Sequence, residues 1–177
     1  IRHTIRDLLR QRIMGLACGY EDANDAARLA DDPLHKLAVG RDPVTGSALA
    51  SQPTLSRFEH AASPRPLYRM GDTLAATVTA HHQERLKGRA QRITIDLDPT
   101  PDRTYGQQTF SFFSGCYESW CYQPQLGFLS FDGEHDQHLF HARLRPGNAR
   151  CWRGAFNVLT RTVAHLREAF PGVKIRV

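Results

Sequence analysis

The first half of the chain carries apolar residues at helical spacing. From Thr4 to about Gly19 the apolar side chains recur every three or four positions, which predicts a first helix that ends at the glycine. Shorter helical patterns follow. They cover residues 22–29 and 33–39, a segment that begins at Ser51 or Pro53, and a segment from Asp72 or Thr73 to Gly88. Residues 1–88 are therefore predicted to form an all-helical region.

The hydrophobic period changes at Arg92. From there apolar and polar residues alternate through Asp98, which is typical of a strand with one buried face. Further strands are expected in two aromatic-rich runs and one extended run, at residues 109–117, 120–131 and 138–145. An apolar stripe over residues 149–170 predicts a long helix, and residues 173–177 read as one more strand.

This order of elements predicts an α+β fold, in which the helical region precedes a sheet domain at residues 89–177. Three adjacent antiparallel strands would be followed by a crossover helix and a fourth strand that returns parallel to the first. A ribonuclease H-like core begins in this way. Such a core needs further elements to cover the exposed face of its sheet, so we expect residues 89–177 to be an incomplete core that belongs to a longer gene product.

The charge balance favours an anionic partner. The formal net charge is +5 and the isoelectric point is near 9.3, and arginine greatly outnumbers lysine. No stretch approaches the roughly 18 to 20 uninterrupted apolar residues of a membrane span, and the charged start lacks the apolar core of a signal peptide. A cytoplasmic protein without a membrane partner is expected.

The cysteines and histidines allow a zinc site as one reading. Cys116 and Cys121 lie near His135, His138 and His141. Neither a Cys-x-x-Cys pair nor a matching histidine pair is present, so small buried thiols and surface imidazoles are the favoured interpretation.

Two carboxylates are the clearest candidates for chemistry. Asp96 and Asp98 are two residues apart on a predicted strand, so their side chains share one face, about 6 to 7 Å apart. Hard cations such as Mg²⁺ prefer oxygen ligands and commonly use one or two protein carboxylates. A solvent-facing acidic edge is the alternative for an isolated Asp-x-Asp pair.

Four blocks of sequence change that balance. In chain order they are GYEDAND at residues 19–25, LASQPTLSRFE at 49–59, DLDPTPDRTYGQQ at 96–108 and LRPGN at 144–148. Together they resemble the group 1 DDE transposases of bacterial insertion sequences, in which a strand reading Asp-x-Asp-x-Thr is followed by a Gly-x-Gln segment. Tyr105 departs from the pattern, because the family usually has histidine there.

The resemblance implies metal-dependent DNA cleavage and strand transfer, with two Mg²⁺ or Mn²⁺ ions in the complete enzyme. It places the first carboxylate of the catalytic triad on Asp98, with Asp96 as the second choice. The second Asp would follow Val177 and the Glu would lie further on. A chain with one triad position should bind metal weakly and catalyse nothing.

The resemblance also implies double-stranded DNA as the partner, at transposon ends and at the target, with a homo-oligomer in the complete assembly near the bacterial nucleoid. Arg143 and Arg145 on one strand face, Asn148 after a turn, and Arg57 in the helical region are candidate DNA contacts. Surface solvation is the alternative for each.

Aromatic side chains of the two aromatic-rich runs are expected to pack in the core of the sheet rather than to stack on bases. They are Phe110, Phe112, Phe113, Tyr117, Trp120 and Tyr122.

Two rival functions remain open at this level. A non-catalytic DNA-binding or regulatory protein, derived from a truncated transposase gene, would keep the helical region and the basic charge. An unrelated ribonuclease H-like nuclease would share the strand order but has no reason to carry the 49–59 and 144–148 blocks.

Overall fold

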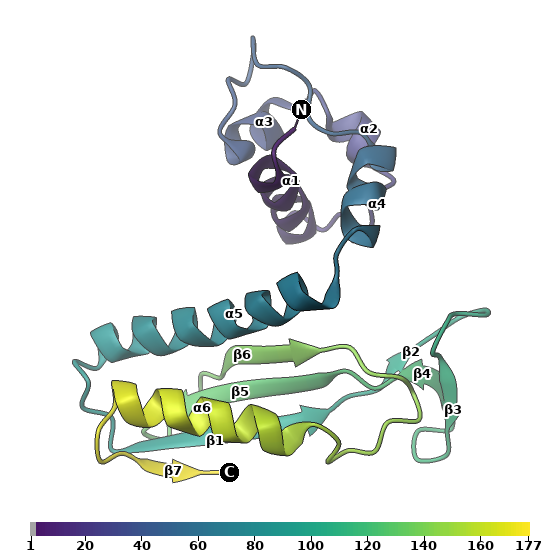
Figure 1. The fold of residues 1–177 in the computed structure, drawn as a ribbon. Coiled ribbons are helices and arrows are strands. Elements are labelled where there is room, and N and C mark those ends of the chain that lie inside the picture. The colour runs from purple at the N-terminus through teal and green to yellow at the C-terminus, as the bar shows by residue number, and fades with distance from the viewer. Residues whose placement is uncertain (1–2) are drawn as a thin grey trace. The chain divides into compact units, whose positions relative to one another are not determined.

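The chain forms two compact units, residues 1–64 and residues 65–177, and the computed structural model describes residues 3–177 (Figure 1). The helices are α1 (Ile5–Ala17), α2 (Ala26–Leu29), α3 (Pro33–Val39), α4 (Gln52–His60), α5 (Pro64–Arg85) and α6 (Ala155–Ala169). The strands are β1 (Arg92–Pro99), β2 (Asp102–Arg103), β3 (Phe112–Ser114), β4 (Ser119–Tyr122), β5 (Gln125–Phe131), β6 (His138–Arg143) and β7 (Lys174–Arg176). The fold is α+β, as the sequence predicted.

Helices α1 to α4 make up the first unit. Thr4 caps α1, because its hydroxyl accepts from the Asp7 amide while the Asp7 carboxylate accepts from the Thr4 amide. The buried Gln11 side chain both donates to and accepts from the backbone of Ala50, at 2.9 Å in each direction. This pair of hydrogen bonds joins α1 to the segment before α4. The apolar cluster of the unit is Leu8, Ala26, Ala50 and Leu55.

Helix α5 is longer than the sequence predicted. It begins at Pro64 and not at Asp72 or Thr73, because a proline in the first turn of a helix loses no hydrogen bond. Its residues Ala75, Val78 and Leu86 pack against the core of the sheet. The compact units therefore divide after Pro64, and α5 lies with the sheet, whereas the sequence grouped it with the helices of residues 1–88.

The main sheet has the strand order β6-β5-β1-β7. β1 is antiparallel to β5, β5 is antiparallel to β6, and β7 lies parallel to β1 after the crossover through α6. This arrangement is the expected succession of three antiparallel strands, a crossover helix and a parallel return.

The first aromatic run does not join the main sheet, contrary to the prediction. It forms a separate sheet of order β2-β4-β3, in which Phe113 lies opposite Trp120. Phe110, Phe113 and Trp120 are each more than half exposed, so core packing was the wrong expectation for these three rings. A hairpin inserted between β1 and β5 satisfies its backbone locally and needs no place in the larger sheet.

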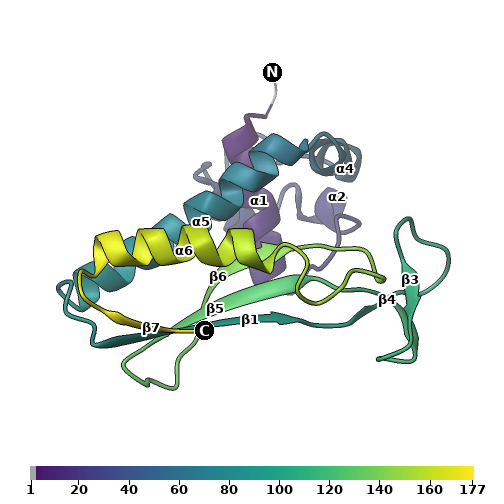
Figure 2. The same ribbon diagram turned by 60° about the horizontal axis from the view of Figure 1, so that its bottom comes forward.

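Both helices of the second unit cover the same face of the main sheet (Figure 2). Ile93, Ile95 and Phe131 are almost fully buried under them, together with Leu166 of α6 and Phe140 of β6. Gly127 leaves room for the Phe140 ring, since a Cβ there would lie 2.8 Å from it. In residues 3–177 we find no helix that is both long and apolar enough to span a membrane.

Candidate active site

The alternation of β1 decides which way its two carboxylates point. Ile93 and Ile95 face the buried core, so Asp96 and Asp98 lie on the opposite face, and both are exposed. Their partners across the antiparallel ladder are Phe128 for Asp96 and Leu126 for Asp98. The acidic pair therefore borders a partly apolar strip on the uncovered face.

Neither carboxylate is engaged by another side chain. Of the ion pairs and side-chain hydrogen bonds within residues 3–177, none involves Asp96 or Asp98. On the β7 side the register partner of Thr94 is Arg176, so the Arg176 side chain lies on the same sheet face as Asp96 without forming an ion pair with it. The carboxylate oxygens are thus free to accept a ligand.

The end of β1 is held firmly in place. Pro99 pairs with Gln125, which is 1% exposed, and the Thr100 amide donates to the Pro124 carbonyl at 3.1 Å. Asp98 precedes this anchored corner by a single residue. The backbone next to Asp98 is therefore fixed in position, so the Asp98 carboxylate is attached to a rigid part of the sheet.

The carboxylates do not belong to a larger ligand cluster in the described part of the chain. No group of three His, Cys, Asp or Glu side chains there lies close enough to hold a metal ion. Cys121 is buried and Cys116 is exposed. The described residues therefore offer Asp96 and Asp98 to a cation without a third carboxylate.

Arg145 differs most from its expected position. β6 ends at Arg143, so Arg145 does not share a strand face with it, and Arg145 is only 4% exposed. Its Nε donates to the Gln123 carbonyl at 2.9 Å, and its Nη1 donates to three carbonyls of the segment before α6. Burial lowers the pKa of this guanidinium from its ordinary value. Arg145 clamps a loop in this structure and does not present its charge to solvent.

Crowding by neighbouring backbone explains the glycine of the 144–148 block. A Cβ on Gly147 would lie 2.0 Å from the carbonyl oxygen of Cys121 and 2.7 Å from that of Phe112. The side-chain amide of Gln123 donates through Nε2 to the Gly147 carbonyl at 2.9 Å and to the Ser114 hydroxyl at 3.2 Å. The block therefore fastens the small sheet to the end of the main sheet, beyond Asp98.

The long helix starts later than predicted, because the segment before it is held in a non-helical conformation. Residues 151–154 form turns, Arg145 donates to carbonyls of this segment, and α6 begins at Ala155 after Gly154, whose φ is +87°. A left-handed residue cannot continue a helix, so the apolar stripe extends beyond the helix itself.

The remaining candidate DNA contacts are exposed. Arg143 stands at the end of β6, Asn148 follows the Gly147 turn, and Arg57 lies on α4, in the first unit. Arg57 makes one weak contact, to the Thr54 hydroxyl at 3.5 Å.

Buried His82 on the inner face of α5 lies against partly buried His138 of β6, and the sequence patterns did not predict this pair. His82, 2% exposed, stacks on Phe131 at 4.4 Å and lies 4.0 Å from the His138 ring. Burial, then the neighbouring His138 and Arg85, lower the pKa of His82 from 6.5 to about 4. Arg85 also forms a two-pronged ion pair with Glu134 on the turn before β6. The only sequence signal was His82 on the apolar face of its helix.

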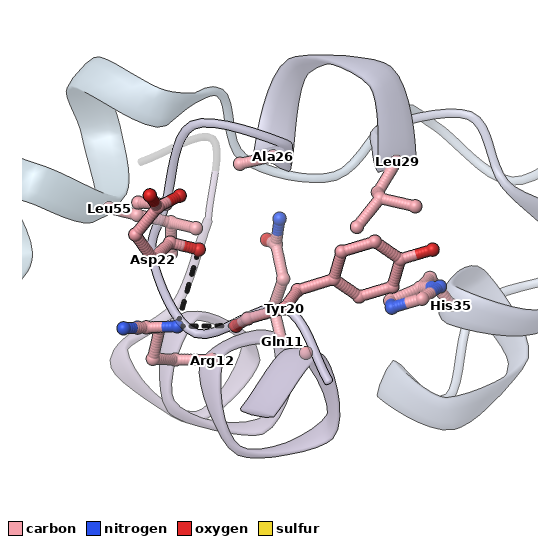
Figure 3. A pocket seen from close by; sticks show the side chains of 10 residues that line it. Gln11, Arg12, Tyr20, Asp22, Ala26, Leu29, His35 and Leu55 are labelled. Carbon is pink, nitrogen blue, oxygen red and sulfur yellow. Dashed lines mark hydrogen bonds between the residues drawn. The ribbon is translucent and has the colours of Figure 1, made fainter. Parts of the chain in front are cut away.

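The hollow in the first unit shows what the first two sequence blocks do (Figure 3). At its rim Arg12 donates to the backbone carbonyls of Tyr20, Glu21 and Asp22. Arg12 also pairs with the Glu59 carboxylate. One arginine thus joins the 19–25 block to the last residue of the 49–59 block. The hollow is small and its wall is mainly apolar, so we interpret it as a gap in the packing of the helices in the first unit.

Comparison with known families agrees with the sequence blocks. The family model described as transposase DDE domain group 1 matches residues 1–177. No curated protein and no solved structure matches the chain.

Proposed function

Because the chain belongs to the group 1 family of transposase DDE domains, we propose that it supplies the first carboxylates of an active site that cleaves and joins DNA strands. The observation that carries this proposal is the position of Asp96 and Asp98. Both are exposed on one strand face and neither is engaged by a neighbouring side chain. A carboxylate with no partner in the fold is available for a ligand.

The donor set suits a divalent metal ion, which transposases of this family generally use. Carboxylate oxygens are the ligands that Mg²⁺ and Mn²⁺ prefer, and a strand holds two of them at a fixed spacing. Asp98 is the proposed first ligand and Asp96 the second. When bound, such an ion activates the attacking oxygen and stabilises the leaving oxygen of a phosphoryl transfer. Asp98 holds its oxygens beside the anchored backbone of Pro99 and Thr100.

The strand order supports a ribonuclease H-like core as the scaffold. β1 carries the carboxylates at the centre of the sheet, and β7 runs beside it in parallel. In this proposal a further Asp and a Glu complete the triad, and residues 1–177 without them bind metal but do not cleave DNA.

The proposed substrate is double-stranded DNA at a transposon end and at its target, held by a homo-oligomer. Arg143, Asn148 and Arg57 are exposed and remain candidate phosphate contacts. Arg145 is proposed as a scaffold for the loop instead, since its guanidinium donates to four backbone carbonyls.

A second candidate is a non-catalytic DNA-binding or regulatory protein. It is consistent with the formal net charge of +5, which favours an anionic partner whether or not the chain cleaves DNA. The two candidates differ in whether a further Asp and a Glu complete the triad and give DNA cleavage.

Metal binding by the chain tests the proposed site on β1. Binding of Mn²⁺ is measured by water-proton relaxation. We expect weak binding to the wild-type chain, still weaker binding to Asp98→Asn, and a smaller loss of affinity in Asp96→Asn. Asp102→Asn is the matched control, because Asp102 is also an exposed strand carboxylate but lies on β2. Equal losses in all three variants, or none, would contradict a metal site on β1.

The cleavage test uses a transposase that contains residues 1–177 together with the second Asp and the Glu. There Asp98→Asn should abolish Mg²⁺-dependent nicking at a transposon end while the protein stays folded. Nicking that survives in Asp98→Asn but not in Asp96→Asn would move the ligand two positions earlier on β1.

A further inference from the structure

Two aromatic rings, one in the segment between β6 and α6 and one in the first turn of α6, are exposed and do not pack in the core. Trp152 is 66% exposed and Phe156 is 79% exposed. A large ring left in water loses the gain of burial, so exposed tryptophans are concentrated where a partner covers them.

The same segment is strongly positive. No Asp or Glu occurs between Asp136 and Glu168, while arginines recur throughout. The Arg150 guanidinium carbon lies 5.9 Å from the centre of the Trp152 ring, and Arg153 is exposed beside it. Arg150 takes one side of the indole, which leaves the other side for a planar ligand.

The segment is also preorganised. Arg145 holds the carbonyls of Arg150, Cys151 and Arg153 at 3.1 to 3.2 Å, so Trp152 lies between two fixed points of the backbone. A ligand that binds here orders little further chain, which favours affinity. The buried Arg145 thus fixes the backbone that carries the exposed Arg150 and Arg153.

Another exposed aromatic pair lacks the charge. Phe113 of β3 and Trp120 of β4 lie 6.3 Å apart on the small sheet, but Asp102 shares their sheet face and Glu118 precedes β4. Carboxylates repel a phosphate backbone, so this pair does not suit DNA. It provides an internal control with the same type of side chain.

We propose that Arg150, Trp152 and Arg153, here called the arginine-tryptophan loop, form a binding site for single-stranded DNA. An unpaired base stacks on the free side of the Trp152 indole, and Arg150 and Arg153 contact the phosphates on either side of it. Stacking of this kind tolerates any base, so the site selects unpaired strands and not a sequence. The proposal rests on the proposed function only in taking DNA as the partner.

Tryptophan fluorescence tests the site directly. The chain has two tryptophans, so Trp120→Phe leaves Trp152 as the only reporter. Titration with oligo(dT) in the presence of a chelator should quench Trp152, whereas a duplex of equal length should quench it less. Trp152→Leu should weaken binding of oligo(dT) by about tenfold, and Trp120→Leu should leave the affinity unchanged.

The salt dependence tests the arginines. Arg150→Gln and Arg153→Gln should each weaken binding and reduce the slope of log affinity against log salt by about 0.7. Arg28→Gln, a change at an exposed arginine of α2, should alter neither. Because Trp152 is exposed, its variants should keep the wild-type melting temperature, and Trp152→Phe should retain part of the affinity.

Several outcomes would overturn the site. The first is wild-type affinity for oligo(dT) in Trp152→Leu, and the second is an equal loss of affinity in Trp120→Leu. The third is tighter binding of duplex than of oligo(dT), with an affinity that neither tryptophan variant changes. A change of sedimentation in Trp152→Leu with unchanged DNA binding would assign the surface to a second copy of the chain. The assay contains no metal, so failure of the β1 carboxylates to bind Mn²⁺ would sink the proposed function and leave this site standing.

Discussion

Arg12 pairs with Glu59 across the first unit while the rest of its guanidinium donates to backbone carbonyls that follow α1. The two residues come from different helices, and Glu59 is the last residue of the 49–59 sequence block. Their contact gives that block a structural purpose, because it fixes α4 to the turn after α1. Catalysis need not be invoked for either residue.

Loss of Arg12 should therefore weaken the first unit. Arg12→Leu removes one ion pair and leaves three carbonyls without their donor, so the free energy of unfolding should fall by about 2 kcal/mol. Urea unfolding followed by circular dichroism measures it. Arg28→Leu is the control, since Arg28 makes an exposed pair with Asp25 and lies over the Tyr20 ring at 5.8 Å without donating to backbone carbonyls, so its loss should change the unfolding free energy much less. Equal effects of the two changes would show that Arg12 contributes no more than a surface ion pair.

Gly147 should tolerate no side chain. Gly147→Ala places a Cβ against the backbone of Cys121 and Phe112, so the small sheet must shift, at a cost of about 3 kcal/mol in unfolding free energy. Thermal unfolding compares it with Gly115→Ala, because a Cβ at Gly115 would meet no atom within 4 Å and the backbone there is open to other residues. If Gly147→Ala melts with the wild type, the close approach of these backbones is not required.

Arg145 should control how firmly Trp152 is held. Arg145→Met fills a similar volume but cannot donate to the carbonyls of residues 123, 150, 151 and 153. We expect greater quenching of Trp152 by acrylamide, measured in the Trp120→Phe background, together with lower stability. Arg145→Lys keeps the charge yet lacks the guanidinium fork, so it should rescue little. Full rescue by lysine would mean that charge alone holds the loop.

His82 should make the second unit sensitive to acid. Its pKa is 6.5 when unfolded and about 4 when folded, so between these values the unfolded chain binds a proton that the folded chain refuses. Stability should therefore be constant above about pH 7 and fall as the pH drops towards 4, by up to about 3 kcal/mol. Burial of the ring is the main cause of the lowered pKa, the charges of His138, Arg85 and His81 add to it, and Glu134 opposes it.

The matched variant is His82→Phe, which keeps a stacking ring over Phe131 but cannot titrate. Urea unfolding at a series of pH values should show a flatter profile for it between pH 4 and 7. A profile as steep as that of the wild type would assign the acid sensitivity to other groups.

Local pattern was enough to predict most individual elements. The alternation through residues 92–98 predicted β1 and placed Asp96 and Asp98 together on one face, which the structure has. A strand exposes alternate side chains whatever surrounds it, so this part of the candidate site follows from covalent geometry. The helices α1 and α3 likewise follow from their caps and apolar spacing.

Contacts between distant segments decided the rest. The aromatic hairpin left the main sheet, and Arg145 became buried, because residues 110–123 and 145–153 meet there and satisfy one another's backbone. No local period encodes that meeting. An arginine two residues beyond Arg143 looks the same in sequence whether it faces phosphate or four carbonyls, and only the packing around it determines which of these it binds.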